Sequence, residues 1–167
     1  MPVNYQIKSQ LAKLLATEDL VVENRNVETA QFNVDTRVLT LPNWKRASES
    51  VYDMLVGHEV GHALYTPNVD PPRHIPHQFV NVTEDARIEK LIKRRYPGLS
   101  KTFYKAYNEL SDDDFFCLED EDVDAMNLAD RANLWFKIGG FIDLTFTEDE
   151  QKSLMLLGHL RLTMMPV

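Results

Sequence analysis

The residues best suited to chemistry lie in one short stretch, Gly57–His62, which reads Gly-His-Glu-Val-Gly-His. His58 and His62 are four residues apart, so on a helix their imidazoles share one face and can reach the same metal ion. Glu59 stands beside the first histidine, where a carboxylate can take a proton from an attacking water. The pattern therefore predicts a zinc site of the H-E-x-x-H type, with Glu59 as the catalytic base and acid.

A purely structural role for the two histidines is the alternative. The stripe that Val51 and Leu55 begin continues through both histidines at i+7 and i+11, so both are expected to face inward. Two buried imidazoles and a buried carboxylate need several polar partners. The neighbouring Met54, Leu55 and Val56 offer none, which favours the metal-binding interpretation.

A catalytic zinc site has three protein ligands and one open position. The third ligand is expected at the start of the next predicted helix, where Glu84 follows His62 after 21 intervening residues. Glu84 and Asp85 point about 100° apart on a helix, so both cannot easily bind one ion. Glu84 is favoured because it shares its face with apolar residues, which gives His58, His62 and Glu84 as ligands. Asp85 would then accept a hydrogen bond from a histidine or pair with Arg87, and either acid could instead complement the helix N-terminus.

This ligand set implies metal-assisted hydrolysis of a peptide bond. Zinc lowers the pKa of water toward about 7 and polarises the carbonyl, and Glu59 carries the proton to the leaving amine. A further donor must stabilise the oxyanion. The spacing leaves six candidates open, namely Tyr65, His74, His77, Tyr104, Tyr107 and His159.

Length and composition limit the possible folds. The 167 residues are expected to form one domain, 1–167, with a core at about 20–100 and a helical half at about 101–167. A hydrophobic content of 44% is enough for a core. The low count of six glycines and the long periodic stretches favour a mainly helical α+β fold.

Hydrophobic periodicity and breaker residues place the expected elements. Helices are predicted at residues 4–16, 48–65, 80–95, 102–110 and 121–138, and from 147 onward. A short strand is predicted at 20–22 and a hairpin at 29–34 and 37–41, which Pro42 ends. This small N-terminal antiparallel sheet is expected to pack on the H-E-x-x-H helix, because so few strands cannot stand alone.

Local signals refine the helix boundaries. Ser50 begins an S-x-x-D capping box at the motif helix, and Ser48 is the other candidate for its N-cap. Thr147 begins a second capping box at the last helix. Gly57 and Gly61 each cost about 1 kcal/mol inside a helix relative to alanine, so another backbone or a substrate is expected to pass close to them.

The charge distribution excludes some functions. A net charge of −8 argues against general nucleic-acid binding. Basic residues nevertheless cluster between Arg87 and Lys105, and a nucleic-acid accessory role for residues 90–95 is a weaker hypothesis. The segment 107–130 holds ten acids and no lysine or arginine. It lacks the EF-hand pattern, and an exposed loop is expected at 111–120.

Cysteine content and hydropathy suggest the compartment. The single cysteine, Cys117, rules out an internal disulfide and a cysteine-based zinc cluster, and we expect an incidental, partly buried thiol. The sequence shows no 18-residue apolar span and no basic start followed by an apolar stretch. These features predict a soluble, cytoplasmic protein without a membrane partner.

The motif at 58–62, the segment at 81–89 and the Pro-Gly pair that follows together resemble a known family. They are similar to the gluzincin-like metallopeptidase domain found beside von Willebrand A domains, in the related subunit of the aerobic cobalt chelatase, and in phage and bacterial proteins. The matching residues are His58, Glu59, His62, Asn81, Glu84, Asp85, Arg87, Glu89, Pro97 and Gly98. The resemblance covers residues 20–100 and includes the hairpin that ends at Pro42.

The resemblance implies a zincin-like fold, zinc bound by His58, His62 and Glu84, and Glu59 as the catalytic acid and base. The leading hypothesis is therefore a zinc-dependent metallopeptidase that acts on a peptide or protein substrate. Some domains of this kind are thought to be metal-binding scaffolds that work with an ATPase. The alternative is thus a non-catalytic, metal-stabilised module whose apolar C-terminal helix docks a partner protein or a missing domain.

Overall fold

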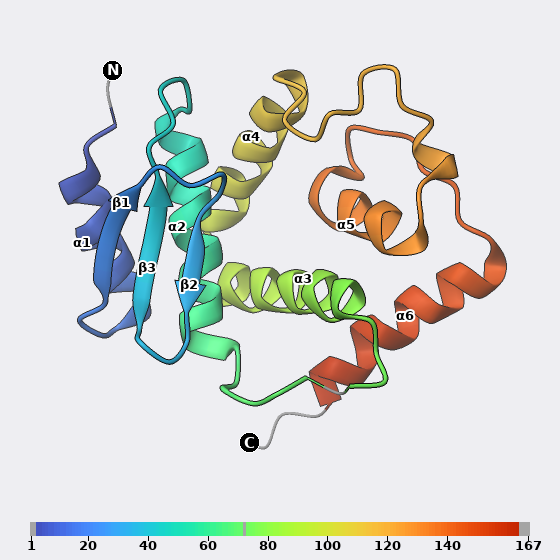
Figure 1. The fold of residues 1–167 in the computed structure, drawn as a ribbon, viewed down its shortest axis with the longest axis horizontal. Helices are drawn as coiled ribbons and strands as arrows, with labels where there is room; N and C mark the ends of the chain where they lie inside the picture. The colour runs from blue at the N-terminus through green and yellow to red at the C-terminus, as the bar shows by residue number, and fades with distance from the viewer. Residues whose placement is uncertain (1–2, 72, 164–167) are drawn as a thin grey trace. The chain divides into compact units, whose positions relative to one another are not determined.

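The computed structural model describes residues 3–71 and 73–163, with side chains through Met155. The elements in chain order are α1 (Tyr5–Ala16), β1 (Val21–Arg25), β2 (Gln31–Asn33), β3 (Val38–Pro42), α2 (Glu49–Tyr65), α3 (His77–Arg95), α4 (Leu99–Asp112), the 3₁₀ turn η1 (Val123–Ala125), α5 (Leu128–Ile138) and α6 (Glu148–Thr163) (Figure 1).

Internal contacts group the chain into two compact units. One unit is formed by Met1–Asp70 and Ile88–Ala106, and the other by Pro71–Arg87 and Tyr107–Val167. Helices α3 and α4 each continue from one unit into the other. This grouping does not test the prediction of a single domain, which concerns independent folding.

The three strands form a mixed sheet in the order β1-β3-β2 (Figure 1). Strands β2 and β3 are the predicted hairpin, and its turn is held by Asn33, whose Oδ1 accepts hydrogen bonds from the N–H groups of Asp35 and Thr36. Strand β1 pairs in parallel with β3, so the prediction of a purely antiparallel sheet is wrong. Strand β2 pairs with one edge of β3, and β1 pairs with the opposite edge. Because β2 reverses the chain between them, β1 and β3 run in the same direction.

One face of this sheet packs on α1 and α2 (Figure 1). Strands β2 and β3 contact α2, and β1 contacts α1. Leu39 and Leu41 of β3 are fully buried in this layer. The prediction that the sheet packs on the motif helix is confirmed.

The motif helix α2 begins after Ser48, whose Oγ accepts a hydrogen bond from the N–H of Val51 at 3.2 Å. Ser48 is therefore the N-cap, and the preference for Ser50 is wrong. Ser50 lies inside the first turn, where its own backbone is already helical. The cap fixes where α2 starts and hence which residues face the core.

The two mid-helix glycines of α2 allow other helices to approach closely. A Cβ at Gly57 would lie 3.0 Å from the ring of Phe103 on α4. A Cβ at Gly61 would lie 2.8 Å from Cδ1 of Ile88 on α3, nearer than side-chain carbons normally pack. The predicted close approach is confirmed, and the neighbours are α3 and α4.

Helix α1 is joined to α2 by a buried ion pair. Lys8 is 2% exposed, and its Nζ donates to Oδ1 of Asp53 at 2.6 Å and pairs with Glu49. Burial opposes the charge on Lys8, but its hydrogen bonds to the two carboxylates outweigh burial and raise its pKa. The cation therefore stays charged inside the fold and anchors the N-terminal helix.

Tyr52 fixes the connection between β3 and α2. Its hydroxyl donates to the carbonyl of Pro42 at 2.6 Å and accepts from the N–H of Trp44 at 2.9 Å. The hydroxyl of Tyr5 lies 3.2 Å away. Burial, followed by the hydrogen bond with Tyr5, raises the pKa of Tyr52 to about 12.

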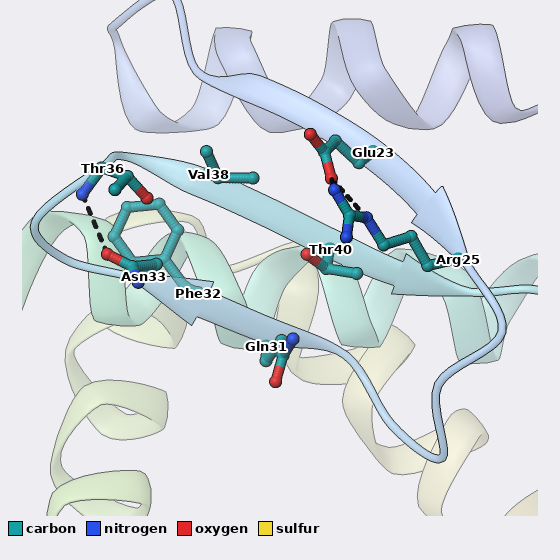
Figure 2. A pocket seen from close by; sticks show the side chains of 8 residues that line it. All are labelled: Glu23, Arg25, Gln31, Phe32, Asn33, Thr36, Val38 and Thr40. Atoms are coloured by element: carbon teal, nitrogen blue, oxygen red, sulfur yellow. Dashed lines mark hydrogen bonds and ion pairs between the residues drawn. The ribbon is translucent and has the colours of Figure 1, made fainter.

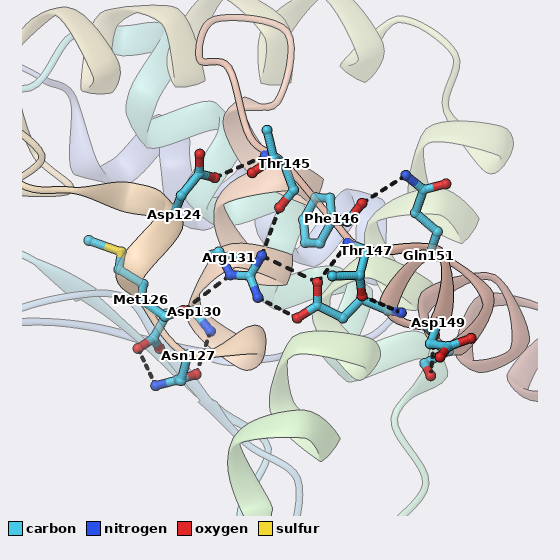
Figure 3. A network of polar contacts seen from close by, with 12 residues as sticks. Asp124, Met126, Asn127, Asp130, Arg131, Thr145, Phe146, Thr147, Asp149 and Gln151 are labelled. Carbon is cyan, nitrogen blue, oxygen red and sulfur yellow. Dashed lines mark hydrogen bonds and ion pairs between the residues drawn. The ribbon is translucent and has the colours of Figure 1, made fainter.

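In the other unit a network of polar contacts centred on Arg131 of α5 connects two loops to α6 (Figure 3). Arg131 donates to the carbonyls of Met126 and Thr145 at 3.1 and 2.7 Å and pairs with Glu150 at 2.5 Å. The predicted capping box at Thr147 is confirmed, since the N–H of Thr147 donates to Glu150 at 2.9 Å and Glu150 N–H donates back at 3.3 Å. The N–H of Thr147 and then Arg131 lower the pKa of Glu150.

The helix predicted at 121–138 is shorter than expected. Asp122 accepts from the N–H of Asp124, and Asn127 accepts from the N–H of Asp130. These side chains compete with helical hydrogen bonding, so α5 starts at Leu128 and a 3₁₀ turn precedes it.

The coarse prediction of an α+β, mainly helical protein is confirmed. None of the helices in residues 3–71 and 73–163 has both the length and the apolar character that crossing a bilayer requires.

Candidate metal centre

Helix α2 places the three motif side chains close together in a nearly buried environment. The ring centroids of His58 and His62 are 5.0 Å apart, and the rings are inclined at 73°. The side chain of His58 is 13% exposed, and Glu59 is 5% exposed. Charges interact more strongly in such surroundings than in water. Two imidazoles and a carboxylate are thus concentrated on two turns of one helix.

Each imidazole of the motif is oriented by an oxygen at Nδ1. Nδ1 of His58 lies 3.0 Å from Oε1 of Glu89, and a carboxylate at this distance accepts the Nδ1 proton. Nδ1 of His62 lies 2.8 Å from Oγ1 of Thr66, the residue that follows α2. Nε2 lies on the opposite side of each ring. Metal-binding histidines use this same arrangement, in which one nitrogen bonds to an oxygen and the other faces the metal.

Glu89 belongs to a chain of contacts that runs to α4. It is 4% exposed, and its Oε2 accepts from Nζ of Lys93 at 3.0 Å. Nζ of Lys93 in turn lies 4.7 Å from the ring centroid of Phe103. Both oxygens of this buried carboxylate therefore have a partner, as burial requires. The contacts fix Glu89 and, through it, the ring of His58.

One group of described side chains is able to hold a metal ion. Ligand atoms of His58, His62 and Asp85 all lie within 4.8 Å of one another. Asp85 lies on α3 one turn before Glu89, so the two acids share a helix face. Two imidazoles and one carboxylate match the donor set of a catalytic zinc site.

Glu84, the favoured third ligand in the sequence analysis, forms an ion pair with Arg87. Nε and a terminal nitrogen of Arg87 donate to its two oxygens at 2.9 and 2.7 Å, and Glu84 is 9% exposed. Asp85 contacts Lys137 of α5 at 3.2 Å. Arg87 thus pairs with Glu84, and a pairing of Asp85 with Arg87 stays a prediction. Metal binding by Glu84 stays a prediction.

The six candidate oxyanion donors lie in different environments. Tyr65 is half-buried at the end of α2, Tyr107 is 6% exposed, and Tyr104 is 65% exposed. His74 and His77 are both exposed, and His77 begins α3, so this helix starts three residues before the predicted residue 80. The side chain of His159 lies outside the described part of the structure. The identity of the donor stays a prediction.

Two further features lie apart from the motif. Residues 113–120 are irregular, as predicted for the acidic segment, and Cys117 is exposed, so the expected partial burial of its thiol is wrong. The outer face of the sheet carries a polar hollow of about 420 Å³ (Figure 2). Its lining consists of Glu23, Arg25, Gln31, Phe32, Asn33, Thr36, Val38 and Thr40. The hollow contains none of the motif side chains.

Sequence reasoning assigned no role to Glu89 or Thr66. Both follow a site residue by four positions, Glu89 after Asp85 and Thr66 after His62. Residues spaced by four on a helix lie on the same face. This spacing to the candidate ligands is the sequence signal that could have identified Glu89 and Thr66. The partner histidine of Glu89 is on another helix and could be found only in the folded chain.

The chain matches no protein-family model, no curated protein and no solved structure.

Proposed function

We propose that this protein is a zinc-dependent metallopeptidase of the gluzincin type, which hydrolyses peptide bonds in peptide or protein substrates. The observation that supports this most strongly is the pair of imidazoles on consecutive turns of α2, each oriented through Nδ1 by a side-chain oxygen. The buried Glu59 beside them supports catalysis over mere metal storage, because a carboxylate next to two candidate zinc ligands can take the proton of an attacking water.

The donor set fits zinc. His58, His62 and Asp85 would hold the ion, with Glu89 orienting His58 and Thr66 orienting His62. When bound, zinc supplies Lewis-acid chemistry, lowering the pKa of water to about 7 and polarising a carbonyl. A softer metal would prefer thiolates, and the chain's single cysteine lies outside this group.

Glu59 would carry the proton in both steps of the hydrolysis. It would accept the proton from the attacking water and deliver it to the leaving amine, and one carboxylate can serve both because it is alternately base and acid. Its low exposure of 5% would limit competition from bulk water. Glu59 follows the candidate ligand His58 by one residue, about 100° further around α2, so it could reach the reacting water without displacing a ligand.

A second candidate is a non-catalytic, metal-stabilised module that binds a partner protein or an ATPase. Met155 on α6 favours it, because this large apolar side chain is 69% exposed next to the buried Leu154. In that case the same three residues would hold a structural zinc, and Glu59 would have no chemical role.

The experiment that separates the two candidates is Glu59→Gln in zinc-loaded protein, assayed by mass spectrometry for cleavage of a peptide library. We expect the wild type to cleave and Glu59→Gln to lose about 10²–10⁴-fold in rate while keeping its zinc. Glu28→Gln, at an exposed acid away from the motif, is the matched control and should retain the wild-type rate. If wild type and Glu59→Gln are equally inactive with zinc bound, the peptidase proposal is rejected in favour of the non-catalytic module.

A further inference from the structure

Four exposed cations on α3 and α4 stand out because none of them forms an ion pair within the described residues. They are Lys90, Arg94, Lys101 and Lys105. Most cations elsewhere in the described chain are paired with an acid, namely Lys8, Lys13, Arg25, Arg37, Arg87, Lys93, Arg131, Lys137 and Lys152. Lys45, Arg46, Arg73 and Arg95 also have no acidic partner among the described residues, but only on α3 and α4 do such unpaired cations stand at i and i+4.

The helices bring these four cations to one side of their unit. Helix α3 packs on Gly61 of α2, and α4 packs on Gly57, one turn away on the same face of α2. On each helix the cations lie about 160–240° around the axis from the residue that makes this contact, Ile88 or Phe103. Both pairs of cations thus face away from α2, and the link at 96–98 joins the two helices closely.

This face is unfavourable for an isolated protein. Each helix carries a like-charged pair at i and i+4, which costs about 0.2–0.5 kcal/mol per pair. Tyr104, with 65% of its surface exposed, lies between Lys101 and Lys105 in the sequence. A polyanion would remove the repulsion, and an exposed ring gives it a surface on which to stack. Like charges at i and i+4 disfavour an isolated helix, and such unfavourable arrangements are typical of binding surfaces.

We propose that this face, which comprises Lys90, Arg94, Lys101, Lys105 and Tyr104, binds single-stranded nucleic acid. The cations contact phosphates, and the ring of Tyr104 stacks on an unpaired base. An acidic polypeptide offers the same charge but not a flat ring beside every charge, so Tyr104 favours nucleic acid. The proposal is independent of the proposed peptidase activity.

The net charge of −8 does not oppose this proposal, because the charge is divided unequally. The unit that carries this face has twelve basic and ten acidic residues, a net charge of +2. The other unit has six basic and sixteen acidic residues, a net charge of −10. The expectation of no nucleic-acid partner was based on the net charge of the whole chain, which does not reveal the difference between the two units.

The test is the fluorescence anisotropy of a labelled oligothymidylate titrated with the full chain at several salt concentrations. Four phosphate contacts at about −0.7 each predict a slope near −3 for log K against log salt. The variant Lys90→Gln, Arg94→Gln, Lys101→Gln, Lys105→Gln should bind at least about tenfold more weakly at about 50 mM salt, with a slope near zero. Tyr104→Leu should bind about tenfold more weakly with the slope unchanged, which a purely electrostatic surface would not show.

The matched control neutralises four other exposed cations, Lys45→Gln, Arg46→Gln, Arg73→Gln and Lys152→Gln, and should bind as the wild type does. Circular dichroism confirms that each variant is folded. Absence of wild-type binding at about 50 mM salt, or an equal loss in the control, would overturn the proposal. Displacement of the oligonucleotide by polyglutamate at equal charge, or by duplex DNA as effectively as by single strands, would overturn it as well.

Discussion

The motif helix α2 and the region from α5 to α6 use polar side chains in opposite ways. In and around α2, Glu59, Glu89 and Lys8 are each at most 5% exposed and lie inside helices, away from their ends. From α5 to α6, Arg131, whose side chain is 11% exposed, and the exposed Thr147 bond to loops and to a helix end. A polar group at a helix end has a local explanation, because terminal N–H and C=O groups need partners. A carboxylate buried in mid-helix is not explained by a helix end, and the proposed metal site would give Glu59 and Glu89 a role.

The glycines of the two regions offer the sharpest contrast in packing. Gly61→Val should lower the free energy of unfolding by about 3 kcal/mol, because a side chain there meets Ile88 at 2.8 Å in a closely packed interior. Gly140→Val is the matched control, since nothing lies within 4 Å of a Cβ there, and should change stability by about 0.5 kcal/mol or less. Urea unfolding measures both. Equal effects at the two positions would show that α3 does not pack on α2 as described.

Removal of the Tyr52 hydroxyl tests how much the buried polar groups around α2 stabilise the fold. Tyr52→Phe leaves the carbonyl of Pro42 and the N–H of Trp44 without their partner and should lower the free energy of unfolding by about 2 kcal/mol.

The raised pKa of Tyr52, about 12, adds a pH dependence, since an unfolded tyrosine titrates near 10. The stabilisation is fully present below pH 10 and is lost as the pH rises through 12, so the wild type should lose stability over that window more steeply than Tyr52→Phe. Parallel pH profiles for the two proteins would contradict this account, and Tyr104→Phe, at an exposed tyrosine, serves as the control.

Disruption of the capping box of α6 tests how much the polar groups between α5 and α6 stabilise the fold. Thr147→Ala should lower the free energy of unfolding by about 1 kcal/mol, because the N–H of Glu150 loses its acceptor. Thr147→Ser keeps an oxygen at this position and should restore most of the loss. The lowered pKa of Glu150 means that this carboxylate stabilises the fold above the ordinary range of glutamate titration and stops doing so as the pH falls. Thermal unfolding of the three proteins checks both points, and an alanine variant as stable as the wild type would contradict the role of the cap.

Much of the local structure could be predicted from the sequence, because it depends on neighbours along the chain. The hairpin at β2 and β3, the N-terminal helix, the box at Thr147 and the close approach at Gly57 and Gly61 all follow from spacing and residue type. The parallel pairing of β1 could not be predicted in the same way, since it depends on which edge of β3 is available. The shortened α5 was missed because acidic and amide side chains in residues 122–127 compete with helical hydrogen bonds.

The candidate site shows the same division. Residues 58–62 could be placed on one helix face from spacing alone. Spacing alone does not decide between Glu84 and Asp85, because the choice depends on the contacts that each carboxylate makes in the folded chain. The role of Glu89 depends on a contact between helices that are 31 residues apart in the sequence.

The zinc content of the purified, folded chain tests the central claim most directly. Elemental analysis should find about one zinc per chain in the wild type and in Glu84→Gln, much less in Asp85→Asn, and almost none in His62→Ala, because a site with three protein ligands tolerates the loss of none of them easily. A wild type that contains no zinc and takes up none when zinc is added would contradict the account, as would a His62→Ala variant that keeps the wild-type content.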